Sequence, residues 1–192
     1  MNRKTLSAFI ILASTLLLLG FVIPPPLTCP VKTYDNWDEH TSGKTISREL
    51  RKAEKSHPHN YKKLAAILFS KAYLNYLRTG GIDTLTFQKT IEAYKASYTK
   101  VKSREAKSES IYMISLTYYY LGDVRQAQMW FSKSAKTIVP YSEYARLGLA
   151  KCLIRQNQLH AADSILTEYS TAQHLQRDSL KSMVLLDIKN GH

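Results

Sequence analysis

The stretch from Ser108 to Pro140 constrains the fold more than any other part of the sequence, because its apolar residues recur at helical spacing. Intervals of three and four residues separate the apolar side chains of its two halves, Ile111, Ile114, Tyr118 and Leu121, then Val124, Ala127, Phe131, Ala135 and Ile138. Between the halves, Gly122 suits the left-handed residue after a helix and Asp123 suits an N-cap, while Pro140 stops the second half. The stretch therefore predicts two short amphipathic helices joined by a tight turn, and each must bury its apolar side against a neighbour.

This pair of helices resembles a tetratricopeptide repeat (TPR). Ala127 and Phe131 supply the A-x3-F step of the second helix, and Tyr118 fits the aromatic position of the first. The sequence differs from the usual repeat at Ile111, Ser115 and Ser134, where Trp, Gly and Ala are commonest, and Pro140 comes one position late. The resemblance implies a helical hairpin that stacks on others like it.

Two weaker copies of the pattern flank the first. In residues 141–170 the turn falls at Asn157 and Gln158, and Ala162 with Leu166 repeats the A-x3-F step. Upstream, Gly80 and Gly81 separate two further apolar stripes, with Thr90 and Tyr94 at the same step, and residues 173–189 suit a capping helix. We therefore expect an all-α domain over residues 60–192, built of stacked antiparallel helical hairpins as in a TPR-like α-solenoid with a C-terminal capping helix.

Residues 1–29 predict a separate hydrophobic helix. Arg3 and Lys4 precede an apolar run of 18 residues from Leu6 to Ile23, which is typical of a signal anchor or of a cleaved signal peptide. The basic start would keep the N-terminus in the cytoplasm and place the helical domain outside it, in the periplasm or at the cell surface. Lipidation at Cys29 is a less favoured alternative, because the residues before it fit a lipoprotein signal poorly.

Residues 30–59 are polar and mixed in charge, and they predict a linker with one short helix from Ile46 to Lys55. His57 and His59 flank a proline without Cys or carboxylate ligands at metal-binding spacing, so we expect no metal and no cofactor. Cys152 falls within an apolar helical stripe and predicts a small buried side chain.

Positive charge is concentrated in the first expected hairpin. The chain has 27 Lys and Arg against 15 Asp and Glu, a net charge of +12. Four cations end this hairpin, Lys100, Lys102, Arg104 and Lys107. They could hold an anionic lipid or polymer or an acidic protein, or could simply be a solvated helix face, whereas nucleic acid is disfavoured because no nucleic-acid motif accompanies them.

The run Tyr118, Tyr119 and Tyr120 cannot lie on one face of a helix, because successive residues are about 100° apart. Tyr118 belongs to the apolar stripe. In the repeats that this chain resembles, the inner face of the first helix lines a groove for a partner's extended or helical segment. By that resemblance the groove residues are Tyr112, Leu116, Tyr119 and Tyr120, with Leu147, Lys151, Ile154 and Arg155 in the next copy. The alternative is that these side chains pack against the neighbouring repeat or the linker.

The sequence carries no nucleophile elbow, zinc-protease signature, phosphate loop or Cys-x-x-Cys pair, so we expect no enzyme. A hydrophobic N-terminal segment followed by helical repeats is similar in layout to membrane-anchored bacterial TPR proteins of the cell envelope. That layout implies a membrane-tethered protein-protein interaction module, an adaptor or assembly factor of an envelope complex. Binding of anionic lipid or polymer through the basic first hairpin is the alternative.

Overall fold

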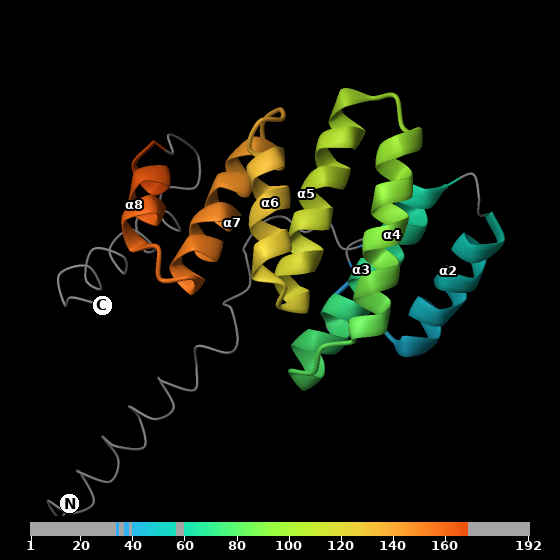
Figure 1. Ribbon diagram of the computed structural model, residues 1–192. Helices are drawn as coiled ribbons and strands as arrows, with labels where there is room; N and C mark the ends of the chain where they lie inside the picture. Colours follow the sequence, from blue (N-terminus) through green and yellow to red (C-terminus); the bar gives the residue numbers. More distant parts are fainter. Residues whose placement is uncertain (1–33, 35–36, 39, 57–59, 169–192) are drawn as a thin grey trace, which may run out of the picture. The chain divides into compact units, whose positions relative to one another are not determined.

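The computed structural model describes residues 34, 37–38, 40–56 and 60–168, all of which belong to the second of two compact units, Lys32–His192. Over these residues the secondary structure is helical, without a strand (Figure 1). The helices are α2 (Gly43–Ser56), α3 (Tyr61–Thr79), α4 (Thr84–Lys100), α5 (Arg104–Leu121), α6 (Val124–Ser134), α7 (Tyr141–Arg155) and α8 (Leu159–Glu168). Each packs on the next in the chain, and α5 also packs on α7. This confirms the all-α prediction and agrees with a solenoid-like arrangement of helical hairpins.

The turns within the three hairpins form where the sequence predicts them. Gly80 and Gly122 follow α3 and α5 with φ of 68° and 87°, a left-handed conformation that glycine adopts without a steric penalty. Asn157, after α7, is also left-handed at φ 57°. The carboxylates of Asp83 and Asp123 then accept hydrogen bonds from the backbone N–H groups of the residues three positions later, and so begin α4 and α6.

The A-x3-F steps all fall in the second helix of a hairpin, and all are buried. Thr90 and Tyr94 lie in α4, Ala127 and Phe131 in α6, and Ala162 and Leu166 in α8, each with a relative exposure of 2% or less. A small residue followed one turn later by a large one therefore occupies an equivalent core position three times. The A-x3-F step that recurs in the sequence therefore recurs as a buried pair in each of the three hairpins.

Helix α6 is shorter than the sequence predicts. It ends at Ser134 and not at Pro140, although the apolar spacing continues through Ala135 and Ile138. The carbonyl oxygen of Ser134 accepts hydrogen bonds from both the backbone N–H and the Oγ1 of Thr137, at 2.9 and 2.6 Å. Local bonds of this kind compete with helix continuation, so the chain turns before the proline. Pro140 instead stands directly before α7.

Residues 30–59 are not a linker throughout. The expected short helix is present and longer, as α2, and it packs on α3. Buried Ile46 and Ala53 of α2 form an apolar cluster with Trp37, Ile67 and Leu74. The packing of α2 on α3 was not predicted from the polar composition of this region, because only one narrow side of α2 is apolar.

Two expected helices, residues 6–23 and 173–189, lie outside the described residues. Among the helices that the structure does describe, none is both long enough and apolar enough to cross a membrane.

Candidate functional site

Tyr120 lies at the centre of an aromatic cluster between the first two hairpins. Its ring centroid is 5.2 Å from that of Tyr73 and 5.7 Å from that of Tyr76, both in α3. Phe69 and Phe87 are 6.2 and 6.3 Å away, and the Phe87 ring is stacked. These separations are typical of favourable aromatic pairs. Tyr120 therefore joins α5 to α3 and α4 and is a core residue.

Tyr119 and Tyr112 contact residues of α6 and of α7, the first helix of the third hairpin. The Tyr119 ring lies 6.4 Å from Phe131, and the guanidinium of Arg155 lies 4.7 Å over its face. Tyr112 contacts Phe131 at 6.1 Å, and it contacts Tyr141 and Tyr144 of α7 at 6.0 Å each. Burial raises the pKa of Tyr119 to about 12. Both tyrosines thus connect α5 to α6 and α7.

The structure places Arg155 over the ring of Tyr119 and buries most of the expected groove residues. Six have a relative exposure of 5% or less, Tyr112, Leu116, Tyr119, Tyr120, Leu147 and Lys151. Ile154 is half-buried and Arg155 is exposed. The ring contacts favour the alternative, that these side chains pack between neighbouring hairpins, and a partner-binding role for them stays a prediction. Tyr118, which the sequence assigns to the core, is the most exposed of the three tyrosines.

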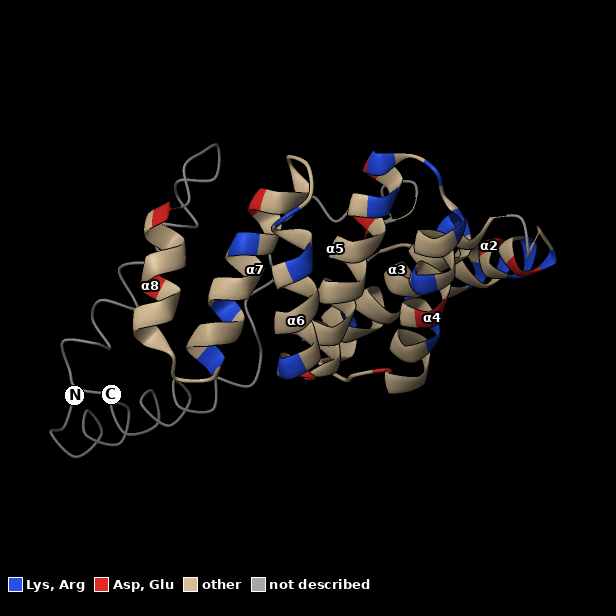
Figure 2. Ribbon diagram, turned by 45° about the horizontal axis from the view of Figure 1, so that its top comes forward, with Lys and Arg blue, Asp and Glu red and all other residues tan. Residues whose placement is uncertain are grey.

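The four cations expected to bind an anionic surface lie around the turn between α4 and α5, where Figure 2 shows blue ribbon, and all four side chains are exposed. Lys100 Nζ lies 3.2 Å from the hydroxyl of Tyr61 and 4.3 Å over its ring, while Lys107 lies 6.0 Å over Tyr98. Lys102 is in the turn and Arg104 begins α5. The structure therefore places these four residues together in solvent.

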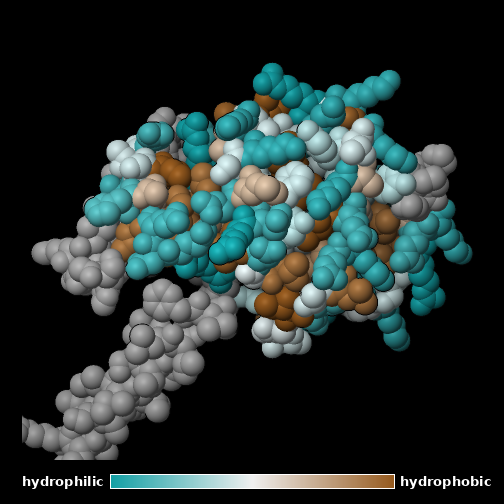
Figure 3. Space-filling view, viewed as in Figure 1, coloured by the Kyte–Doolittle hydropathy of each residue, from teal (hydrophilic) through white to brown (hydrophobic). Residues whose placement is uncertain are grey.

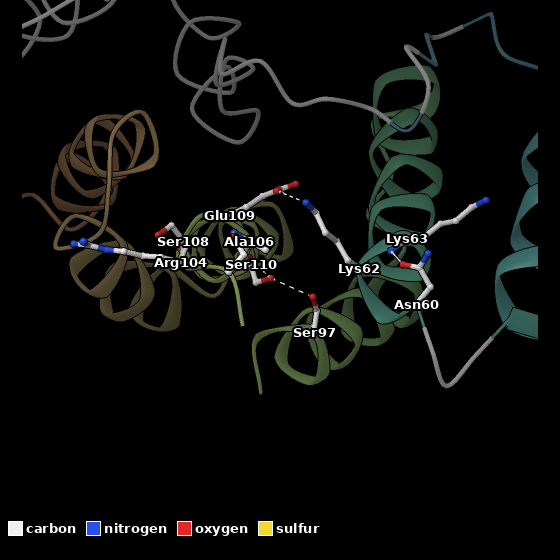
Figure 4. A network of polar contacts seen from close by, with 10 residues as sticks. Asn60, Lys62, Lys63, Ser97, Arg104, Ala106, Ser108, Glu109 and Ser110 are labelled. Carbon is white, nitrogen blue, oxygen red and sulfur yellow. Dashed lines mark hydrogen bonds and ion pairs between the residues drawn. The ribbon is translucent and has the colours of Figure 1, made fainter. Parts of the chain in front are cut away.

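Polar contacts fix the helices beside this turn (Figure 4). Lys62 of α3 forms an ion pair of 2.6 Å with Glu109 of α5, and the hydroxyl of Ser110 donates to that of Ser97 of α4 at 3.3 Å. Ser97 and Ser110 are buried, so the second contact satisfies polar groups inside the packing. These bonds hold α3, α4 and α5 in register at the basic end.

A second group of cations and aromatic rings, which sequence analysis missed, lies on α4, α5 and α6. We call it the lysine-aromatic surface, and it consists of Lys95, Tyr98, Tyr118, Trp130 and Lys133. Lys133 Nζ lies 4.8 Å over the Tyr98 ring and 4.9 Å over the Trp130 ring. Lys95 Nζ lies 5.8 Å over Trp130 and 5.6 Å over Tyr118, whose hydroxyl oxygen is 3.1 Å away. Two ammonium groups therefore lie within about 6 Å of the centroid of the indole ring.

Both lysines of this surface are exposed, whereas its three aromatic residues are half-buried. Within the described part of the chain, the ion pairs are Arg48–Glu49, Lys52–Glu49 and Lys62–Glu109, so no carboxylate there neutralises Lys95 or Lys133. An exposed cation-π contact contributes about 0.5–1 kcal/mol, which orients the ammonium group without removing its charge. The surface therefore presents two oriented positive charges beside apolar ring faces.

Two pairs of residues could have revealed this surface in the sequence. Lys95 and Tyr98 in α4, and Trp130 and Lys133 in α6, are each three residues apart and so lie on one side of their helix. Each pair is weak evidence alone. Their juxtaposition depends on α4 and α6 both packing against α5, which single helices do not indicate.

An apolar patch lies at the opposite end of α4. Leu77, Ile82 and Leu85 flank the turn from α3 and are 42%, 49% and 63% exposed. Apolar residues gather at the lower edge of the space-filling view, below α3 and α4 (Figure 3). These three side chains are wholly apolar and offer no polar group of their own to define a ligand.

The described residues contain no group of three or more His, Cys, Asp or Glu that could hold a metal ion. Comparison of the chain with protein-family models, curated proteins and solved structures gives no match. The TPR resemblance accordingly rests on the motif residues alone and stays a prediction. The chemistry that the exposed surfaces offer is recognition of anionic groups.

Proposed function

We propose that this protein is a membrane-tethered protein-protein interaction module with a TPR-like stack of hairpins. In this proposal it holds an acidic segment of another protein and serves as an adaptor or assembly factor of an envelope complex. One observation carries the proposal: Lys95 and Lys133 are exposed, and both ammonium groups lie over the Trp130 ring, without a carboxylate partner among the described residues.

The chemistry of this surface favours a peptide segment over a simple ion. Carboxylates of the partner would pair with the two ammonium groups, and an apolar side chain between them would cover the half-buried indole. Trp is enriched at the energetic centres of protein interfaces, and charge complementarity sets orientation and association rate. Met129, one helical turn before Lys133 in α6, is also exposed and adds flexible apolar area beside that lysine.

The tether is the second part of the proposal. An apolar segment at residues 6–23 behind Arg3 and Lys4 supports anchoring in a membrane with the helical domain outside the cytoplasm. Lipidation at Cys29 is the less favoured means of attachment. The proposal includes no catalysis, metal or cofactor.

The alternative function is binding of an anionic lipid or polymer at the α4–α5 turn, through Lys100, Lys102, Arg104 and Lys107. Their joint exposure at one turn favours it. Such binding consists almost wholly of screened charge contacts, so it should be lost between about 0.1 and about 1 M salt, as the Debye length falls from about 10 to about 3 Å. Binding at Trp130 includes apolar contact and should persist in part.

A photo-crosslinking residue in place of Met129 tests the proposed function. In membranes that contain the full chain, we expect one protein partner to be crosslinked in stoichiometric yield. The double variant Lys95→Glu/Lys133→Glu should abolish this product, whereas Lys89→Glu/Arg125→Glu, which changes the net charge equally at exposed positions elsewhere, should preserve it. An undiminished product in the first variant would refute the lysine-aromatic surface as the binding site.

A further inference from the structure

Helix α2 carries a stripe of cations along one side. Lys and Arg occur at intervals of four, three, one and three residues, at Lys44, Arg48, Arg51, Lys52 and Lys55. At 100° per residue these positions fall within an arc of about 100°. All five side chains are exposed, and the stripe is about 17 Å long at 1.5 Å per residue. We call it the α2 basic stripe.

The packing of α2 fixes the stripe outward. Ile46 and Ala53 lie on the opposite side of the helix and are buried against Trp37, Ile67 and Leu74. Rotation of α2 would expose this apolar side, so the stripe cannot turn towards the protein without loss of the cluster. Figure 2 shows the ribbon of α2, with several blue Lys and Arg positions, at the end of the row of packed helices, and Figure 3 shows the same region as hydrophilic.

The acidic residues of α2 offset the stripe only in part. Glu49 forms ion pairs with Lys52 at 2.8 Å and with Arg48 at 3.5 Å. Glu54 lies off the stripe, and α2 as a whole has five cations against two carboxylates. Lys44, Arg51 and Lys55 have no carboxylate partner among the described residues. A row of three uncompensated charges therefore faces solvent.

We propose that the α2 basic stripe docks on the anionic surface of the membrane that holds the chain. This inference rests on the proposed tether. Only 19 residues separate Ile23 from Gly43, which limits the distance from the end of the apolar segment to α2 to about 70 Å. Lys and Arg that lie at an anionic lipid surface contribute about 1 kcal/mol each to binding, so a row of five favours such a surface wherever the membrane carries anionic headgroups.

The composition of the stripe favours a membrane over other polyanions. Its exposed positions offer ammonium and guanidinium groups and the hydroxyl of Ser47, without an aromatic ring or amide. A peptide would gain no apolar anchor there, and single-stranded nucleic acid would find no ring on which to stack its bases. A plane of lipid headgroups needs only an exposed row of charges, which the outward-facing stripe supplies.

The experiment uses the full chain in lipid nanodiscs, either purely zwitterionic or containing phosphatidylglycerol. A donor dye is attached to Ser47→Cys in a Cys29→Ser background, and an acceptor dye is carried by the lipid headgroups. Cys152 is fully buried and stays unlabelled in the folded protein. We expect greater energy transfer in the anionic discs, and we expect about 0.5 M salt to reduce it to the zwitterionic level.

Charge reversal provides the decisive comparison. Lys44→Glu/Arg51→Glu/Lys55→Glu should abolish the difference between the two kinds of disc, since loss of three cations lowers the docked-to-free ratio on the order of a hundredfold. The matched variant Lys89→Glu/Arg125→Glu/Lys136→Glu has the same net charge and should retain the difference, and circular dichroism checks that both are folded. Equal transfer in both lipids, or equal loss in both variants, would overturn the proposal.

The same discs separate this inference from the proposed function. A chain that inserts in the discs and crosslinks its partner through position 129, yet shows no lipid-dependent transfer, refutes only the α2 docking. A chain that docks but loses no partner in the Lys95→Glu/Lys133→Glu variant refutes only the lysine-aromatic site. A chain that does not co-purify with either kind of disc refutes the tether and the docking together.

Discussion

The ring of Phe131 in α6 occupies the space that a side chain at position 148 of α7 would need. A Cβ atom added to Gly148 would lie 2.4 Å from Cε1 of Phe131 and 2.5 Å from Cζ, well inside van der Waals contact. Phe131 is fully buried and also contacts the rings of Tyr112 and Tyr119. The missing side chain at Gly148 therefore allows the second and third hairpins to close on one aromatic core.

Gly148→Ala should destabilise the fold by up to about 2 kcal/mol. Overpacking of a tight core costs about 1–3 kcal/mol, and the higher helix propensity of Ala returns about 1 kcal/mol. The free energy of unfolding from urea titration, followed by circular dichroism, measures the net effect. Gly43→Ala is the control, because no atom lies within 4 Å of an added Cβ there, and it should leave stability unchanged or slightly higher.

A smaller side chain at position 131 should rescue the variant. Phe131→Leu removes the ring atoms that would clash with the methyl group introduced by Gly148→Ala, so the double variant should be less destabilised than the sum of the two single changes. Additive effects would contradict the contact between Gly148 and Phe131.

The three consecutive tyrosines of α5 should differ widely in their contribution to stability. Tyr120→Ala removes a buried ring from contact with five others, and we expect a loss of about 3–5 kcal/mol. Tyr118→Ala removes a half-buried ring whose polar contact is with exposed Lys95, and we expect a loss of about 1 kcal/mol or less. Urea unfolding of the two variants side by side would disprove this ranking if Tyr118 proved the costlier.

The burial of these tyrosines shows that helical periodicity alone was insufficient to predict which of them lies in the core. The spacing of Ile111, Ile114 and Tyr118 correctly marks one apolar stripe, yet α5 is enclosed by α4, α6 and α7, with rings of α3 against Tyr120, and is buried on nearly every side. A stripe describes a helix with one neighbour. For a helix with several neighbours, a residue on the stripe can be more exposed than residues off it, as Tyr118 is in comparison with Tyr119 and Tyr120.

The turns were predictable because their chemistry is local. Gly80 and Gly122 take the left-handed conformation that follows a helix, and Asp83 and Asp123 cap the next helix with their own carboxylates. The lysine-aromatic surface was not predictable in the same way. It depends on Lys95 of α4 and Trp130 of α6 meeting across residues distant in the chain, and this is decided by packing.

Cys152 should be unreactive in the folded protein. Its side chain is fully buried, and burial raises the pKa of the thiol to about 12, so almost no thiolate forms at about pH 8. We expect iodoacetamide at that pH to leave Cys152 unmodified, as measured by mass spectrometry of its peptide. The same reagent in concentrated guanidinium chloride should modify it fully, and rapid modification without denaturant would show that the α7 core opens.

The pKa shift of Tyr119 predicts a specific loss of stability in alkali. Burial raises its pKa from 10.0 to about 12, so the folded state retains the phenolic proton while the unfolded state releases it. The stability that depends on protonation of the Tyr119 hydroxyl is therefore fully present below about pH 10. It is lost as the pH rises from about 10 to about 12, at up to about 1.4 kcal/mol per pH unit. Burial raises the pKa of Tyr141 to about 12 as well, so wild-type stability should fall steeply over this interval.

Tyr119→Phe isolates one of these titrations, because phenylalanine keeps the ring contacts with Tyr120 and Phe131 but cannot ionise. Its free energy of unfolding should run parallel to that of the wild type between about pH 7 and about pH 9. Above about pH 10 it should fall less steeply, by up to the slope of one titrating group. Urea unfolding at intervals of about half a pH unit measures both curves, and curves that stay parallel to about pH 12 would mean that the Tyr119 hydroxyl is not buried in the folded protein.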